Sequence, residues 1–256
     1  MIQHAIVRLP GENFAEGLTG VNLGLPVYAR ARQQHEEYCA ALEQCGLKVI
    51  RLEADEQYPD STFVEDTAVL TEHCAVLTNP GAPSRAGEVE SIGKALSPFY
   101  SELHYIHDPD TVEGGDICQA GNHFFIGISA RTNETGAQQL ARLLTAFDYT
   151  SSFVDIREVE GILHLKSGLA YLGANCLVVI EALANRAEFA SYDLIRVGDG
   201  DEYAANCVAI NGSVLVAAGH DGFDARLRKM GYQTVALEMS EFQKMDGGLS
   251  CLSLRF

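Results

Sequence analysis

The chain has 256 residues and a mass of 27.7 kDa, enough for one large domain or two small ones. Its 35 acidic and 18 basic side chains give a formal net charge of −17, which argues against binding to nucleic acid or to an anionic membrane surface. The longest apolar stretches are far shorter than the ~20 residues of a membrane-spanning helix, and the first residues do not have the pattern of a signal peptide.

The cysteine content indicates a reduced protein. Seven cysteines are present, an odd number, and no two are spaced as Cys-x-x-Cys. A disulfide framework and a structural zinc site are therefore not expected, and we expect a cytoplasmic location.

Strands and helices alternate along the chain. Short apolar runs bounded by Gly, Asn or Asp predict strands, and apolar residues at three- and four-residue spacings predict helices between them. The predicted strands include residues 5–7, 47–50, 75–77, 123–126, 177–180 and 213–216, and the predicted helices are residues 28–44, 86–96, 135–147 and 223–230. This alternation indicates an α/β fold class.

An internal repeat organises these elements. Three segments, opening near Glu65, Gly115 and Asn206, each show strand, tight turn, strand, loop and helix. Asp66 and Asp116 lie at equivalent places, and a period of about fifty residues fits five units into the chain. Five units around one axis would bring the opening residues of each unit to a central channel. The alternative is an ordinary mixed sheet with accidental similarity. Since no segment has the composition of a linker, we expect one domain, residues 1–256.

Two side chains could supply nucleophilic and acid–base chemistry. Cys251 follows a Gly247-Gly248 pair that permits close approach of the backbone to a ligand, and a thiolate is a strong nucleophile. A buried, unreactive role is the usual alternative for a free cysteine. His164 lies in an apolar stretch, where a histidine is more often a packed core residue than a catalyst.

Acidic clusters strengthen the case for a shared site. Residues 59–66 and 111–116 combine carboxylates with turn residues, a pattern that solvated turns also use. Because both clusters open repeat units, side chains from four units, Asp66, Glu113, His164 and Cys251, would face one another around the central channel. A metal site at His104, His107 and Asp108 is a weaker alternative.

Six segments, taken jointly and in order, resemble the bacterial dimethylarginine dimethylaminohydrolases of the guanidino-group-modifying superfamily, which also includes arginine deiminases and amidinotransferases. The segments are residues 59–66, 111–116, 129–133, 164–171, 203–207 and 246–256. The resemblance implies a five-bladed α/β propeller of pseudo-fivefold ββαβ units, in agreement with the repeat.

The resemblance also implies an activity and a set of residues. The expected reaction is hydrolysis of N-omega-methylated L-arginines to L-citrulline and the methylamine, through a covalent thiouronium intermediate and without a metal or organic cofactor. The implied catalytic residues are Cys251 as nucleophile, His164 as general acid and base, and Glu113, which with Asp66 would hold the guanidinium nitrogens. The implied substrate-binding residues are Leu18, Asp60, Phe63, Glu65, Asp66, Arg85, Arg131, Met245 and Asp246. Residues 17–24 would form a mobile lid.

Related functions stay open at this point. An arginine deiminase or another substituted-guanidine hydrolase is one alternative, although Lys166 stands where arginine deiminases have a carboxylate and the chain lacks room for their additional helical module. Arg85 and Arg131 suggest a substrate α-carboxylate, which disfavours agmatine. A non-catalytic binding protein is another alternative, because a ribosome anti-association factor shares the propeller fold. We expect a small cationic amino-acid substrate and a homodimer, with no nucleic-acid or membrane partner.

Overall fold

All five β-sheets of the protein follow one three-stranded plan. In each sheet the middle strand pairs antiparallel with one neighbour and parallel with the other. The computed structural model describes residues 1–256, which divide into two units: residues 65–205, and residues 1–64 together with 206–256. The repeat expected from the sequence is therefore present in both units, and the expectation of a single domain stays a prediction.

Residues 65–205 contain three of the sheets. Their strands are β3 (Ala68–Leu70), β4 (Ala75–Leu77) and β5 (Leu103–Tyr105), then β6 (Ile117–Ala120), β7 (His123–Ile128) and β8 (Thr150–Asp155), then β9 (Leu169–Gly173), β10 (Cys176–Ile180) and β11 (Asp193–Val197). The first two strands of each sheet form a hairpin, and the third returns parallel to the second. Helices α2 (Glu88–Leu96) and α3 (Glu134–Thr145) make the first two crossovers, whereas two 3-10 turns, Glu181–Leu183 and Ala187–Phe189, replace a helix in the third.

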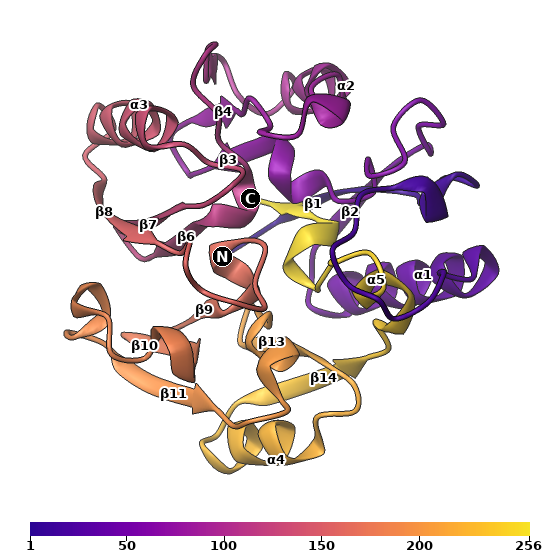
Figure 1. Ribbon diagram of the computed structural model, residues 1–256, viewed down its shortest axis with the longest axis vertical. Helices are drawn as coiled ribbons and strands as arrows, with labels where there is room; N and C mark the ends of the chain where they lie inside the picture. Colours follow the sequence, from indigo (N-terminus) through magenta and orange to yellow (C-terminus); the bar gives the residue numbers. More distant parts are fainter. The chain divides into compact units, whose positions relative to one another are not determined.

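Helix α3 shows how a crossover helix covers its sheet. The side chain of Asn133 caps the helix by accepting a hydrogen bond from the Gly136 amide at 2.7 Å. The face that carries Leu140 and Leu144 packs with Phe124 of β7 in one buried cluster, and Figure 1 shows α3 alongside β7 and β8. Burial of such side chains, at about 1.5–3 kcal/mol each, is what holds the short strands in place.

Residues 1–64 and 206–256 contain the other two sheets. Their strands are β15 (Leu254–Arg255), β1 (His4–Arg8) and β2 (Lys48–Leu52), then β12 (Val208–Ile210), β13 (Ser213–Ala217) and β14 (Gln233–Leu237). The helices are α1 (Tyr28–Gln44), α4 (Asp221–Lys229) and α5 (Ser240–Gln243). Strand β1 takes its antiparallel partner from the other end of the chain, with Ala5 opposite Arg255 and Ile6 opposite Leu254. Two distant segments thereby complete one repeat.

The predicted elements are confirmed with small changes at their ends. The helix at residues 28–44 and the strand at residues 75–77 have the predicted bounds, and the other predicted elements differ by one or two residues at one or both ends. The hairpin turn between β12 and β13 has Asn211 at φ 46° and Gly212 at φ 93°, the left-handed pair that an Asn-Gly turn predicts. No helix combines the length and the apolar character that crossing a membrane demands.

Helix α1 buries a histidine on its inner face. His35 is fully buried, beside the equally buried Tyr38, Cys39 and Leu42. Burial is the main cause that lowers the pKa of His35 to about 4, and the positive charges of Arg51 and Arg32 act in the same direction. His35 is therefore a neutral packing residue at neutral pH.

This burial predicts a loss of stability in acid. The unfolded chain takes up the His35 proton near pH 6.5, whereas the folded chain takes it up only near pH 4, so the unfolding free energy should fall as the pH drops through this window. The expected total is about 3 kcal/mol. In His35→Gln this part of the pH dependence should disappear, as measured by urea unfolding across the window. An unchanged slope in the variant would contradict the assignment.

Candidate active site

The predicted histidine and glutamate are in direct contact. Nε2 of His164 lies 2.7 Å from Oε2 of Glu113 and 3.9 Å from Oδ1 of Asp66. Glu113 is 0% exposed and His164 is 6% exposed. Three of the four side chains that the repeat places at a shared site are therefore clustered and shielded from bulk water within residues 65–205.

Neighbouring charges set the protonation of this cluster. Burial by itself would lower the pKa of His164, but the charge of Asp66, the hydrogen bond with Glu113 and the charge of Asp116 outweigh burial and raise the pKa to about 9. Burial would likewise raise the pKa of Asp66, yet the positive charges of His164 and Arg85 hold it at about 2. At neutral pH the cluster is an imidazolium among carboxylates, so His164 is charged and able to donate a proton.

Two adjacent glycines let these groups approach so closely. Glu113 precedes a 3-10 turn at Gly114–Asp116. A Cβ atom on Gly114 would lie 2.0 Å from the carbonyl oxygen of Glu65, and a Cβ atom on Gly115 would lie 2.7 Å from the Cγ and Nδ1 atoms of His164. The Gly-Gly pair is therefore needed because both neighbours occupy the space that a side chain would take.

Arg85, a predicted substrate-binding residue, forms two buried ion pairs, one of them with Asp66 of the cluster. Its guanidinium is buried, with Nη1 2.6 Å from Oδ2 of Asp66 and Nη2 2.8 Å from Oε2 of Glu88. Glu88 was not among the predicted residues, although its i,i+3 spacing from Arg85 is typical of an ion pair. The structure thus gives Arg85 an ion-pairing partner in Asp66, and its contact with a substrate carboxylate stays a prediction.

Two further predicted residues lie in the same unit. Glu65 is buried and paired with Lys166 at 2.6 Å between Oε1 and Nζ. Arg131 lies 3.5 Å from Oε1 of Glu113 through Nη1 and is more open, with 19% of its side chain exposed. Arg131 is therefore a more accessible cation than the buried Arg85.

The predicted nucleophile lies in the unit formed by residues 1–64 and 206–256. Cys251 is half-buried in the 3-10 turn Ser250–Leu252, and its Sγ accepts a hydrogen bond from the Gly248 amide at 3.4 Å. The side-chain Oδ1 of Asn206 accepts from the Ser250 amide at 2.9 Å, which fixes this turn. A Cβ atom on Gly247 would lie 2.2 Å from the predicted residue Phe63, so the glycine allows the aromatic ring to pack against the segment that leads to Cys251.

The predicted lid is tied to predicted substrate-binding residues of the same unit. The Leu18 amide donates to both carboxylate oxygens of Asp60 at 3.1 Å. Oδ2 of Asp246 accepts hydrogen bonds from the Gly20 amide at 2.5 Å and from Thr19 Oγ1 at 3.2 Å.

Met245 is buried beside the start of this lid. A Cβ atom on Gly17 would lie 3.3 Å from Cε of Met245, and the same position would lie 2.4 Å from Oδ1 of Asp60. Asp60, Met245 and Asp246 therefore support the lid segment that contains Leu18.

The same buried cluster has the spacing of metal ligands. The ligand atoms of Asp66, Glu113 and His164 lie within 4.8 Å of one another. A metal ion would need the His164 imidazole deprotonated, whereas its raised pKa keeps the proton on the ring at neutral pH. Of the histidines in the weaker alternative, His104 packs edge-on against Phe147 with ring centroids 5.3 Å apart.

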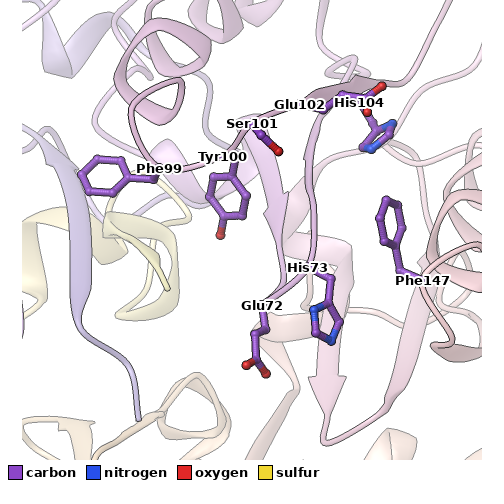
Figure 2. A pocket seen from close by; sticks show the side chains of 8 residues that line it. All are labelled: Glu72, His73, Phe99, Tyr100, Ser101, Glu102, His104 and Phe147. Atoms are coloured by element: carbon purple, nitrogen blue, oxygen red, sulfur yellow. The ribbon is translucent and has the colours of Figure 1, made fainter.

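A cavity of about 230 Å³ lies elsewhere in residues 65–205 and shares no lining residue with this cluster (Figure 2). Its lining side chains are Glu72, His73, Phe99, Tyr100, Ser101, Glu102, His104 and Phe147. Tyr100 donates its hydroxyl to the carbonyl of Thr71 at 3.0 Å, and the ring of His73 lies 5.9 Å from that of Tyr149. These polar groups stabilise the cavity wall and lie among aromatic rings.

Comparison with known proteins gives a consistent result. A model of the eukaryotic N,N dimethylarginine dimethylhydrolase family matches residues 25–199. The N(G),N(G)-dimethylarginine dimethylaminohydrolase of Pseudomonas aeruginosa is 42% identical over the full length of both chains. A solved structure of that enzyme, a cysteine-to-serine variant in complex with citrulline, superposes over 100% of both chains with a TM-score of 0.97 and 41% identity.

A second solved structure is equally similar. It is a histidine-to-glycine variant of a dimethylarginine dimethylaminohydrolase in an adduct with S-methyl-L-thiocitrulline, with a TM-score of 0.97 and 41% identity over 100% of both chains. The predicted fold class, a five-bladed α/β propeller of ββαβ units, is thereby confirmed. The chain belongs to the dimethylarginine dimethylaminohydrolase family of hydrolases.

Proposed function

We propose that the protein hydrolyses N-omega-methylated L-arginines to L-citrulline and the corresponding methylamine. In this proposal Cys251 is the nucleophile and His164 is the general acid and base. Glu113 orients the His164 imidazole and favours its protonated form. The observation that carries the proposal is the buried 2.7 Å contact between His164 and Glu113, beside the ionised Asp66. Family membership supports it, since the related Pseudomonas structure contains citrulline.

Substrate binding uses charge complementarity. A guanidinium is a planar cation whose N–H groups pair with carboxylates through short, charge-assisted hydrogen bonds. In the proposal Glu113 and Asp66 bind this cation. Its positive charge would lower the pKa of His164, and the imidazolium would therefore give its proton more readily to the leaving nitrogen. Arg131, the more open arginine, would pair with the α-carboxylate, supported by the other predicted substrate-binding residues.

The chemical steps follow from these roles. The Cys251 thiolate attacks the guanidinium carbon and forms a tetrahedral adduct, and His164 gives its proton to the departing methylamine. The remaining cationic thiouronium is attacked by water, whose proton returns to His164. Collapse of the second adduct breaks the C–S bond, regenerates the thiolate and releases citrulline, and the proton of the adduct's hydroxyl passes to solvent, where the released amine takes up a proton. One water is consumed and one amine is released for each substrate.

Two finer predictions belong to the same proposal. A homodimer is expected from the family resemblance, and a cytoplasmic location is expected from the cysteine content. Neither affects the roles assigned to Cys251 and His164.

A substrate panel tests the activity directly. Dimethylarginine, monomethylarginine and arginine are supplied separately, and citrulline release is measured. The methylated substrates should give values of kcat/KM exceeding that of arginine by about tenfold or more, the effect expected of one or two methyl groups in a fitted pocket. A preference for unsubstituted arginine would instead assign an arginine deiminase activity.

The covalent step predicts two distinct variants. Cys251→Ala should reduce turnover by about 10⁴-fold or more because the nucleophile is lost, while the unfolding midpoint stays close to that of the parent. Cys45→Ala, at another half-buried cysteine, is the matched control and should keep full activity. His164→Gln should accumulate a covalent adduct, visible as added mass on the denatured protein. Citrulline formation by Cys251→Ala would refute the nucleophile assignment.

The raised pKa of His164 predicts the alkaline limb of the pH profile. In the free enzyme the proton donor is lost as the pH rises through about 9, so kcat/KM should fall there. Glu113→Gln removes a negative charge from the imidazolium and should move this limb to lower pH by about 1–3 units. Glu102→Gln, at the separate cavity, serves as control and should leave the limb in place. An unmoved limb in Glu113→Gln would contradict the electrostatic role.

A further inference from the structure

A second buried carboxylate, Asp116, lies beside the cluster and has no role in the proposed reaction. Asp116 ends the 3-10 turn that begins after Glu113, and it is 0% exposed. Its Oδ1 accepts a hydrogen bond from the Leu165 amide at 3.0 Å, and its Oδ2 accepts one from Ser129 Oγ at 2.7 Å. Both carboxylate oxygens are therefore used to join segments distant in sequence.

The bond to Leu165 fixes the backbone of His164. Leu165 opens the short 3-10 turn Leu165–Ser167, and His164 is the residue that immediately precedes it. The amide of the first residue in such a turn has no partner inside the turn, so Asp116 supplies an acceptor that the turn itself lacks. The anchored Leu165 amide thus restrains the backbone of the adjacent residue His164, which carries the imidazole.

The bond from Ser129 links Asp116, through Thr132, to Glu113, which contacts the imidazole of His164. Ser129 Oγ accepts hydrogen bonds from the amides of Arg131 at 2.9 Å and Thr132 at 3.1 Å. Thr132 Oγ1 in turn accepts from the amide of Glu113 at 3.1 Å. One carboxylate therefore connects the segments that carry His164, Arg131 and Glu113.

The same bond occurs one repeat earlier, which shows that it is built into the fold. Oδ1 of Asp66 accepts from the Gly115 amide at 2.8 Å, and this bond and that from Asp116 to Leu165 each span 49 positions. The two aspartates differ in their other partners. Asp66 is paired with Arg85, whereas the donors to Asp116 are hydroxyl and amide groups. Asp116 thus combines the anchoring bond with a carboxyl group that no guanidinium compensates.

We propose that Asp116 is a positioning residue, which holds the proton donor His164 and its partner Glu113 in one fixed geometry while touching no substrate. The proposal rests on the function proposed above for His164. A buried network of this kind is effective because a displacement of about 1 Å in a catalytic group is enough to cost about 100-fold in rate. Burial raises the pKa of Asp116, whereas the charge of His164 and the hydrogen bonds from Ser129 and Leu165 oppose this shift. When ionised, Asp116 adds its negative charge to those of Asp66 and Glu113 around the imidazolium.

Two substitutions separate the two contributions. Asp116→Asn keeps an oxygen acceptor for the Leu165 amide but removes the charge, and it should lower kcat by about tenfold and lower the pKa of His164. Asp116→Leu removes both acceptors while keeping the branching and the number of side-chain heavy atoms, and it should lower kcat by about 100-fold or more, with a smaller change in KM. The pKa of His164 is measured by NMR titration of its ring Cε1–H signal. Asp148→Asn makes the same chemical change at an exposed turn and is the control.

Ser129→Ala separates the two hydrogen bonds that Asp116 accepts, one from Ser129 and one from Leu165. It removes the hydroxyl to which the Arg131 and Thr132 amides donate and leaves the Leu165 bond intact, so KM should rise by about tenfold, and kcat should fall less than in Asp116→Leu because the Leu165 anchor beside His164 is kept. Circular dichroism and the unfolding midpoint verify folding of every variant, and Asp116→Asn decides the matter if Asp116→Leu does not fold.

The outcomes are distinguishable from failure of the proposed function. If the parent protein does not release citrulline, the proposed function fails, and the His164 titration still reports whether Asp116 acts on the imidazole. A His164 pKa and a kcat in Asp116→Asn equal to those of Asp148→Asn would overturn the positioning role. Equal loss of kcat in Ser129→Ala and Asp116→Leu would overturn the claim that Asp116 positions His164 through its hydrogen bond with the Leu165 amide.

Discussion

The buried contact between His164 and Glu113 depends on compensation of charge. Two carboxylates and an imidazole removed from water would each be costly alone, and they coexist because opposite charges are adjacent. Asp66 is shared between the imidazolium and Arg85, and Arg85 is shared in turn with Glu88. The chain of alternating charges lets the protein keep an imidazolium where a hydrophobic environment would otherwise discharge it.

Such an arrangement is better suited to binding a cation than to stability. The proposed substrate would bring a positive charge to Glu113, which contacts the protonated His164, and to Asp66, which lies between His164 and Arg85. In the proposed reaction, binding and proton transfer would be coupled, since the incoming guanidinium would weaken the hold of the carboxylates on the His164 proton. Glycines 114 and 115 make the coupling possible by letting backbone and ring atoms approach where any Cβ atom would collide.

The five-fold repeat places such groups without long loops. Each repeat carries a short 3-10 turn beside its first strand, and the turns at Gly114–Asp116, Leu165–Ser167 and Ser250–Leu252 precede or contain Glu113, His164 and Cys251. An Asp or Asn side chain accepts from a backbone amide of the following turn, as Asp116 does for Leu165 and Asn206 does for Ser250. Rigid placement of reactive groups is thus a property of the repeat.

Local patterns were enough to predict the helices, the hairpins and the repeat. Apolar spacing predicted the helix at residues 28–44, and the Asn-Gly pair predicted the turn at Asn211, because both depend on contacts a few residues apart. The sequence likewise predicted Glu113, Asp66 and His164 as a group, since they open successive repeats. Asp116 was noticed only as a marker of the period, although its equivalence to Asp66 was a signal for its hydrogen bond.

Other features required the tertiary structure. Pairing of Ala5 with Arg255, the ion pairs of Arg85 with Asp66 and of Lys166 with Glu65, and the burial of His35 all join residues whose proximity no short pattern encodes. The third sheet of residues 65–205 also crosses over through 3-10 turns in place of a helix. By itself the sequence determined which residue types recur and at what period. The protonation of His164 was decided only by the folded arrangement, because a pKa depends on the charges and solvent within a few ångströms and not on neighbours along the chain.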